Sequence, residues 1–340
     1  MRRLVFNQRN LMVTNKTQQT SSPAPQDPNW TPHLGRARWH RKDFFLLAYI
    51  PAITLIAWCL PERLWTVVCN AAARLSMALH RSRTRGHCRK FTEILGEHRT
   101  SLDVDEILKC YLAKNHLARV QCMQCYAPGG WSPHLRLEGR EHIERALAAG
   151  KGAVLWIAPM ASKDLITKMA FHHAGYPVSH LSRFDHGFSI SLWGARLFNP
   201  LWTRIEERFL AERLVISATS QVSPLRLLIK RLHANRLVSV TANHEGRKYP
   251  HTPSFLSGTI QLAEGAPSLS VTTGAALLPV FTVREPDGTF VTKIEPALVS
   301  ATGGSPAQEI DSLIAQFVRL LESYSLRFPC DYQGWGLSRV

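Results

Sequence analysis

Acidic side chains, a disulfide pattern and an apolar N-terminal run are all scarce in this sequence. Asp and Glu number 25 against 41 for Lys and Arg, which leaves a formal charge of +16 over 340 residues. Such an excess favours an anionic partner: a phospholipid surface, a nucleic acid or a phosphorylated substrate. The seven cysteines lack regular spacing, which argues against a secreted disulfide framework. No apolar run follows Arg2 and Arg3, so we expect no cleavable signal peptide and a reducing, cytoplasm-facing location.

Nucleotide and metal motifs are also missing. There is no Walker-type loop and no G-x-G-x-x-G segment, so nothing predicts a nucleotide-phosphate site or a bound cofactor. The pair Cys122 and Cys125 has metal-ligand spacing, with His116 and His134 nearby, but no second pair follows. Two cysteines on one turn of a helical segment are more often packing residues, and we expect no metal ion.

The composition divides the chain into three parts. Residues 1–35 are rich in Ser, Thr, Gln, Asn and Pro and cannot bury enough apolar surface to fold, so we interpret them as a disordered leader. Residues 36–90 carry the longest apolar runs, and residues 91–340 have the mixed pattern of a globular domain. Apolar residues make up 45% of the chain, which suits neither a disordered protein nor a polytopic membrane protein.

The apolar part predicts attachment to a membrane. Residues 44–60 contain no charge, and as a helix they would reach ~25 Å, slightly short of the ~30 Å hydrocarbon core. Residues 64–79 are apolar but are interrupted by Asn70 and Arg74. Basic residues flank both runs: Arg36, Arg38, Arg41 and Lys42 before them, and Arg81, Arg83, Arg85, Arg89 and Lys90 after them. One tilted transmembrane helix, a helical pair embedded from the cytoplasmic face, and a buried core helix all remain open.

Strand and helix patterns alternate in the globular part. Residues 91–150 look helical, and the apolar run at 153–158 suits a buried strand. Further segments are predicted as follows: a helix at 164–175, a strand at 177–182, a helix at 223–235, a strand at 236–242, a hairpin at 276–297 and a last helix from a capping box at Ser305. This alternation predicts an α/β fold with a mixed, largely parallel central sheet covered by helices, preceded by an N-terminal membrane helix and a helical segment.

Four blocks in this order resemble the late acyltransferases of lipid A biosynthesis, the lauroyl and myristoyl transferases of the lysophospholipid acyltransferase superfamily. They are the apolar N-terminal anchor with its helices, the segment GKGAVLWIAPMASKD, the segment from NRLVSVTANHEGRKYP through GAALLPVF, and the ending FPCDYQGWGLSR. The similarity runs from about Trp39 to the C-terminus.

The resemblance implies a catalytic H-x-x-x-x-D/E motif, and here that motif is incomplete. In such enzymes the histidine takes the proton of an acceptor hydroxyl, and the carboxylate orients the histidine. The corresponding segment is Pro159 to Asp164, so the acid is present and proline replaces the base. Proline has no titratable group, and loss of the base alone is worth ~10²–10⁴ in rate.

Two other histidines are candidates for the missing base. His180 and Asp185 repeat the motif spacing one strand later. His244 lies between Asn243 and Glu245, where the family has an acidic turn, and Glu245 is the candidate second acid. A structural hydrogen bond within that turn is an equally good explanation for His244.

The resemblance also implies substrate-binding residues. Arg183 matches a family arginine beside the carboxylate, where a guanidinium can hold a phosphate through two hydrogen bonds. Arg247 and Lys248 follow the acidic turn and are candidates for the same phosphate site. Asn243, which replaces the first acid of that turn, is a further candidate substrate-binding residue. Phe255 and Leu256 lie in the loop that, by resemblance, borders the acyl-chain groove, although such residues are more often core.

The predicted function is acyl transfer from acyl carrier protein or acyl-CoA to a hydroxyl of an anionic lipid A-like or lysophospholipid acceptor. The predicted location is the cytoplasmic face of the bacterial inner membrane. An alternative is an inactive acyltransferase-fold protein that binds lipids or a partner. Nucleic-acid binding has only the net charge in its favour, and the basic residues cluster around the apolar runs, which suits lipid headgroups better.

Overall fold

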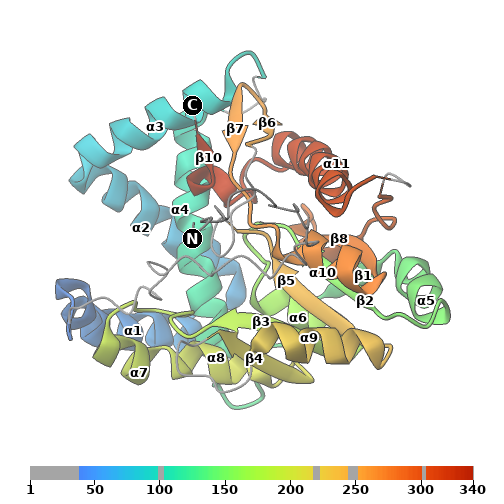
Figure 1. Cartoon of the computed structure of the whole chain (residues 1–340). Coiled ribbons are helices and arrows are strands. Elements are labelled where there is room, and N and C mark those ends of the chain that lie inside the picture. The colour runs from blue at the N-terminus through green and yellow to red at the C-terminus, as the bar shows by residue number, and fades with distance from the viewer. Residues whose placement is uncertain (1–37, 99–102, 217–222, 244–251, 301–303, 340) are drawn as a thin grey trace, which may run out of the picture. The chain divides into compact units, whose positions relative to one another are not determined.

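A computed structural model describes residues 38–98, 103–216, 223–243, 252–300 and 304–339 (Figure 1). The helices are α1 (Arg41–Cys59), α2 (Glu62–Leu79), α3 (Arg81–Leu95), α4 (Val104–Gln124), α5 (Arg140–Ala148), α6 (Leu165–His173), α7 (Leu192–Phe198), α8 (Pro200–Glu207), α9 (Pro224–His233), α10 (Gly265–Thr273) and α11 (Pro306–Arg327). The strands are β1 (Leu135–Glu138), β2 (Ala153–Ile157), β3 (Val178–Arg183), β4 (Glu212–Ile216), β5 (Leu237–Thr241), β6 (Ser254–Phe255), β7 (Gly258–Ile260), β8 (Ala276–Arg284), β9 (Phe290–Ile294) and β10 (Ser338–Arg339). The leader predicted at 1–35 lies outside the described residues.

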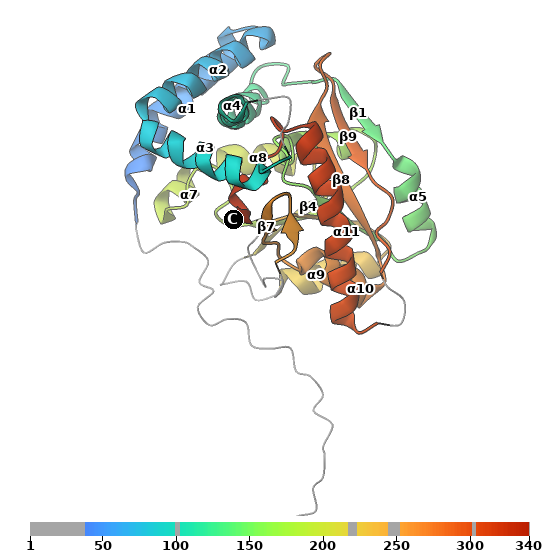
Figure 2. The same ribbon diagram turned by 90° about the horizontal axis from the view of Figure 1, so that it is seen from above.

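The two apolar runs form α1 and α2, and both pack on α4 (Figure 2). Among the described helices, α1 is long and apolar enough to cross a membrane, with a mean hydropathy of 1.5. It nevertheless makes polar contacts along α4: Tyr49 Oη lies 2.8 Å from His116 Nδ1, and Trp58 Nε1 donates to the Met123 carbonyl at 3.0 Å. One side of α1 is therefore bound to the protein, and the other side is exposed.

The main sheet has seven strands in the order β1-β9-β8-β2-β5-β3-β4. The strands β8, β2, β5, β3 and β4 are parallel, whereas β9 pairs antiparallel with β8 in the predicted hairpin and β1 runs parallel to β9. In the register, Ala153 of β2 lies opposite Leu237 of β5 and Ala276 of β8. The mixed, largely parallel sheet predicted from the sequence is confirmed.

The central strand β2 is buried on both faces, as its unbroken apolar run predicts. Val154 and Trp156 point into one core, which includes residues of α10 and α11. Leu155 and Ile157 point into a second core formed with α5 and α6. Helices therefore cover both faces of the sheet, and β2 has a fixed position between them.

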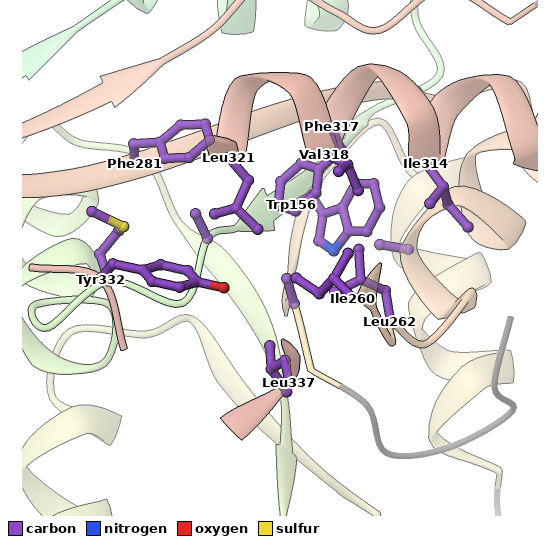
Figure 3. Close-up of a cluster of buried hydrophobic side chains, with 14 of the residues drawn as sticks. Trp156, Ile260, Leu262, Phe281, Ile314, Phe317, Val318, Leu321, Tyr332 and Leu337 are labelled. Carbon is purple, nitrogen blue, oxygen red and sulfur yellow. The ribbon is translucent and has the colours of Figure 1, made fainter. Parts of the chain in front are cut away.

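The C-terminal segment folds back onto this core (Figure 3). Trp156 stacks on Phe317 of α11 with 3.8 Å between ring centroids, and Tyr332 is fully buried in the same cluster. The last strand, β10, pairs with β7 in a small three-stranded sheet.

The structure departs from the sequence-based assignment mainly between the predicted elements. Residues 91–150 look helical in sequence, but Leu135–Glu138 forms β1 at the sheet edge. The helices α7 and α8 and the strand β4 were not predicted, because they span only 7, 8 and 5 residues. The capping box that starts α11 is confirmed, with Ser305 Oγ accepting from the backbone N of Gln308.

Candidate active site

The candidate site lies at the carboxyl ends of β2, β3 and β5. Because these strands are parallel, the turns that follow them meet at one edge of the sheet. The chain after β2 leads to β3 on one side, whereas the chain after β5 leads to β8 on the other side of β2. Such a switch point leaves a crevice in which open α/β sheets commonly bind ligands.

The turn after β2 is held in place by the C-terminal tail. Ala161 donates its backbone N–H to the Asp331 carbonyl at 2.7 Å, and Gln333 donates to the Pro159 carbonyl at 2.8 Å. Met160 forms an isolated antiparallel bridge with Tyr332. Two of the blocks that carry the family resemblance, far apart in sequence, are therefore in direct contact. The proline at the motif's histidine position is buried and contributes no titratable group to the turn.

Asp164 follows this turn directly before α6 and faces several charges. Its Oδ2 lies 3.3 Å from Nζ of Lys163. Burial raises the pKa of the Asp164 carboxyl, but Lys163, His186 and Lys168 together outweigh burial and the nearby Glu206, so the pKa lies below its usual value. The acid of the predicted motif is thus kept ionised.

A histidine that the sequence analysis did not single out lies beside this acid. His186, in the turn after β3, has Nε2 3.1 Å from the Glu206 carboxylate of α8. Donor atoms of Asp164, His186 and Glu206 all lie within 4.8 Å of one another. The imidazole is half-buried, with 26% of its side chain exposed. The edge therefore holds an acid from one turn and an imidazole from the next.

Glu206 is fixed by groups from three directions. Its buried carboxylate lies 2.8 Å from Nζ of Lys168 on α6, and the Trp202 indole N–H donates to it at 2.9 Å. Burial raises the pKa of Glu206, but His186 and Lys168 outweigh it and hold the pKa well below its usual value. Glu206 is thus an ionised acceptor whose position is set by the core.

The chemistry of the donor set decides between a metal site and a proton-handling site. Two carboxylates and one imidazole can hold a divalent cation in proteins. Here, however, the ammonium groups of Lys163 and Lys168 already balance the two carboxylates. A divalent cation would be repelled by Lys168, which touches the same carboxylate. The arrangement fits an imidazole oriented by carboxylates better than a metal centre.

The second H-x-x-x-x-D spacing does not form a dyad. His180 is buried in the middle of β3, and its Nδ1 lies 2.8 Å from the Ser239 hydroxyl of β5. Asp185 instead accepts two hydrogen bonds from Arg183, at 2.7 Å from Nε and 2.5 Å from Nη2. Burial lowers the pKa of His180 well below its usual value, so it remains neutral. The Arg183 guanidinium points into this same turn.

Of the remaining predicted site residues, three are described by the structure and four are not. Asn243 follows β5, and its carbonyl accepts from the backbone N of Ala263 at 2.7 Å. Phe255 is fully buried and lies against Tyr332, and Leu256 is half-buried beside Glu322. The predicted residues His244, Glu245, Arg247 and Lys248 lie outside the described residues. The roles predicted for Asn243, Phe255 and Leu256 stay predictions.

A cavity of about 480 Å³ adjoins the turn after β2. It lies between α2, α4, the tip of the β8–β9 hairpin and the C-terminal tail, and Ala161 and Ser162 of the turn line it. Its charged lining residues are Lys114, Arg284, Glu285, Asp287 and Asp331. The cavity is large enough for part of a lipid or of a pantetheine arm.

Sequence reasoning missed His186 and Glu206, although one signal for Glu206 was present. Lys168 lies in the otherwise apolar run 165–171, and a lysine there needs a buried anionic partner. Nothing in the sequence identified which acid this was, because Glu206 lies 38 positions away on a short helix.

Comparisons with known proteins identify the family of the chain. The sequence matches the family described as bacterial lipid A biosynthesis acyltransferase over residues 36–323. Among solved structures, the chain is similar to the 1-acyl-sn-glycerophosphate (LPA) acyltransferase PlsC from Thermotoga maritima, with 14% identity and a TM-score of 0.36 over 78% of this chain and 98% of that one. A comparison with curated protein sequences gives no match. Because the family match spans most of the described fold, this chain belongs to the bacterial lipid A biosynthesis acyltransferase family.

Proposed function

We propose that the protein transfers an acyl group from acyl carrier protein or acyl-CoA to a hydroxyl of a lipid A-like or lysophospholipid acceptor. In this proposal His186 replaces the missing motif histidine as general base. The observation that carries it is the His186 imidazole at 3.1 Å from the Glu206 carboxylate, beside Asp164 at the carboxyl edge of the sheet.

The hydrogen bond to Glu206 sets the tautomer of His186. A carboxylate only accepts, so Nε2 carries the proton and donates it. Nδ1 is then the nitrogen that accepts the proton of the acceptor hydroxyl. Two nearby carboxylates stabilise the imidazolium that forms, as in other carboxylate–histidine pairs.

The reaction then follows from this proton transfer. The acceptor oxygen attacks the thioester carbonyl and forms a tetrahedral adduct. When the adduct collapses, the carbon–sulfur bond breaks, an oxygen ester remains, and the thiolate takes the proton from His186. The base is regenerated, and no redox partner or metal is needed.

The membrane location is supported by the charge and the N-terminal helices. Residues 36–90 would attach the chain to the bacterial inner membrane from the cytoplasmic side, and residues 91–340 would hold the site. The excess of basic residues favours an anionic acceptor. Arg183 would bind a phosphate of that acceptor only by releasing the Asp185 carboxylate, to which it donates two hydrogen bonds.

The test is an acyl-transfer assay with the full chain in detergent micelles, a radiolabelled acyl-acyl carrier protein and candidate acceptors. We expect turnover that falls by about 10²–10⁴ in His186→Gln. The matched control is His173→Gln, an exposed histidine at the end of α6, which should keep wild-type turnover. Lipid binding without any turnover would instead support the inactive lipid-binding alternative, and equal turnover in both variants would exclude His186 as the base.

A further inference from the structure

The short helix α7 exposes apolar side chains and buries small ones. Ile190, Trp193 and Leu197 are 57%, 44% and 56% exposed, whereas Gly194 and Ala195 face the protein. Single exposed apolar residues are common, but three large ones within eight positions form a patch. The outward face of α7 thus carries Trp193 and Leu197 beside Arg196, whereas Phe198 points into the protein.

The helix α7 is fixed to the start of α1. Asp43 of α1 is buried and accepts hydrogen bonds from the hydroxyls of Ser189 and Ser191, at 2.5 and 2.6 Å. Trp193 donates its backbone N–H to the carbonyl of Arg38 at 3.2 Å. A side chain at Gly194 would meet Asp43 Oδ1 at 2.5 Å, so only glycine permits this approach. The two helices therefore present their exposed faces as one unit.

The exposed apolar surface continues from α7 onto α1, and basic residues border it. The residues that form this α1–α7 surface are Trp39, Phe44, Phe45, Leu47, Ile190, Trp193 and Leu197. Arg38, Arg41 and Lys42 lie exposed at the start of α1, and the Arg196 guanidinium stacks over the Trp193 ring at 5.5 Å. An apolar face with tryptophan and a basic border matches the boundary between lipid headgroups and acyl chains.

We propose that the α1–α7 surface inserts into the headgroup layer of an anionic phospholipid bilayer, with α7 as a second insertion element beside α1. This deepens the membrane location of the proposed function. The lateral polar contacts of Tyr49 and Trp58 with α4 keep α1 alongside a helix that carries several charges. A transmembrane path for α1 would pull those charges into hydrocarbon, whereas a path along the surface leaves them in water.

The insertion element is linked directly to the candidate base. The Asn199 side chain bonds both the N–H and the carbonyl of Ser189, each at 2.8 Å. Gly187, next to His186, packs so closely on Asn199 that a Cβ there would approach it to 2.8 Å. The segment from His186 to α7 is thus tied down at both ends, and insertion of α7 would bring the turn that holds His186 close to the lipid surface.

The first experiment measures binding of the full chain to vesicles of phosphatidylcholine and phosphatidylglycerol by co-sedimentation. Trp193→Glu combined with Leu197→Glu should weaken partitioning by at least about tenfold, because two large apolar side chains leave the interface. The matched control is Leu225→Glu combined with Val299→Glu, since these side chains are 51% and 70% exposed elsewhere on the molecule. The control should bind within about twofold of the wild type. Equal loss in both variants would overturn the proposal.

The second experiment reports lipid contact without depending on turnover or on the stability of a charged variant. A benzoylphenylalanine at position 197 should give phospholipid adducts on illumination with the same vesicles, and one at position 299 should not. Adducts between two copies of the chain at position 197, or no lipid adduct there, would contradict the proposal. Because neither readout involves acyl transfer, an inactive enzyme with lipid adducts at 197 would reject the proposed function and retain this inference.

Discussion

The turns after β2 and β3 share one edge of the sheet but contribute in opposite ways. The turn after β2 holds the family's acid, Asp164, and is shaped by backbone hydrogen bonds to the C-terminal tail. The turn after β3 holds His186, whose position depends on side chains, above all on Glu206. One turn supplies a fixed scaffold with a carboxylate, and the other supplies the group that can accept a proton.

If His186 is the base, as we propose, the motif is divided between two strands. In a parallel sheet the carboxyl ends of neighbouring strands lie only one or two strand spacings apart, about 5–10 Å. A base moved from the first turn to the second therefore stays within reach of the same acid. An imidazole in the second turn needs its own carboxylate to orient it, and here that carboxylate is Glu206.

The largest expected effect is a difference in turnover between two variants, each with one substitution in one of the two turns. Pro159→Ala should leave turnover within about threefold of the wild type, because Pro159 has no titratable group and its carbonyl, which accepts from Gln333, is kept. His186→Gln should lower turnover by about 10²–10⁴. Both are measured in the micelle assay at equal concentrations of folded protein. A loss in Pro159→Ala as large as that in His186→Gln would remove the contrast between the turns.

The next largest effect is expected on the free energy of unfolding when Glu206, the partner of His186, is changed. Glu206→Gln leaves the Lys168 ammonium buried beside a neutral amide, so the free energy of unfolding should fall by about 3 kcal/mol. Glu207→Gln is the matched control, because Glu207 is exposed and pairs with Arg213 at the surface. It should change the free energy of unfolding by less than about 0.5 kcal/mol. Urea unfolding followed by circular dichroism measures both, and similar values for the two variants would contradict a buried ion pair.

The free energy of unfolding should also depend on pH in acid, and this dependence should differ between the wild type and Glu206→Gln. The pKa values of Asp164 and Glu206 are lowered in the fold, so in acid the unfolded chain takes up protons first. Their stabilisation is therefore present above the ordinary carboxyl pKa of about 4.5 and is lost as pH falls through the lower folded values. Each group contributes a slope of up to about 1.4 kcal/mol per pH unit. The free energy of unfolding of Glu206→Gln should thus vary less steeply below pH 4.5 than that of the wild type.

The smallest change in the free energy of unfolding is expected at Asp331, in the C-terminal tail that contacts the turn after β2. Asp331 forms an ion pair with Lys114 at 2.5 Å, yet burial raises the pKa of this carboxyl more than Lys114 lowers it. The charged form is therefore not strongly favoured by folding. Asp331→Asn should change the free energy of unfolding by less than about 1 kcal/mol, because the turn is held by the backbone of residue 331. Thermal unfolding would show a larger loss if the side chain were the essential contact.

Much of the fold could be predicted from sequence because its signals are local. The unbroken apolar run of β2, the capping box at Ser305 and the hairpin between β8 and β9 each correspond to an element of the structure. The order of the four blocks also identified the family, which the match over residues 36–323 confirms. Asp164 was located correctly at the sheet edge because the motif spacing fixes it relative to β2.

The site could not be completed from sequence because its second half depends on tertiary contacts. His186 was one of 15 histidines, and only the fold brings it to the acid. Glu206 lies on α8, a helix of 8 residues that gives only a weak sequence signal, and it pairs with Lys168 on α6. His180 had the right spacing but the wrong environment, since the middle of β3 is buried and hydrogen-bonded to β5. Spacing alone did not distinguish these cases.

The contact between the C-terminal tail and the turn after β2 has a consequence for synthesis. Ala161 donates to the carbonyl of residue 331 and the Pro159 carbonyl accepts from residue 333, each about 170 positions further along the chain. During synthesis, residues 36–90 therefore leave the ribosome long before the turn after β2 can be completed. In the proposed function, a nascent chain would reach the bilayer before it could act on a lipid, and a chain that stops before residue 331 should mimic that state.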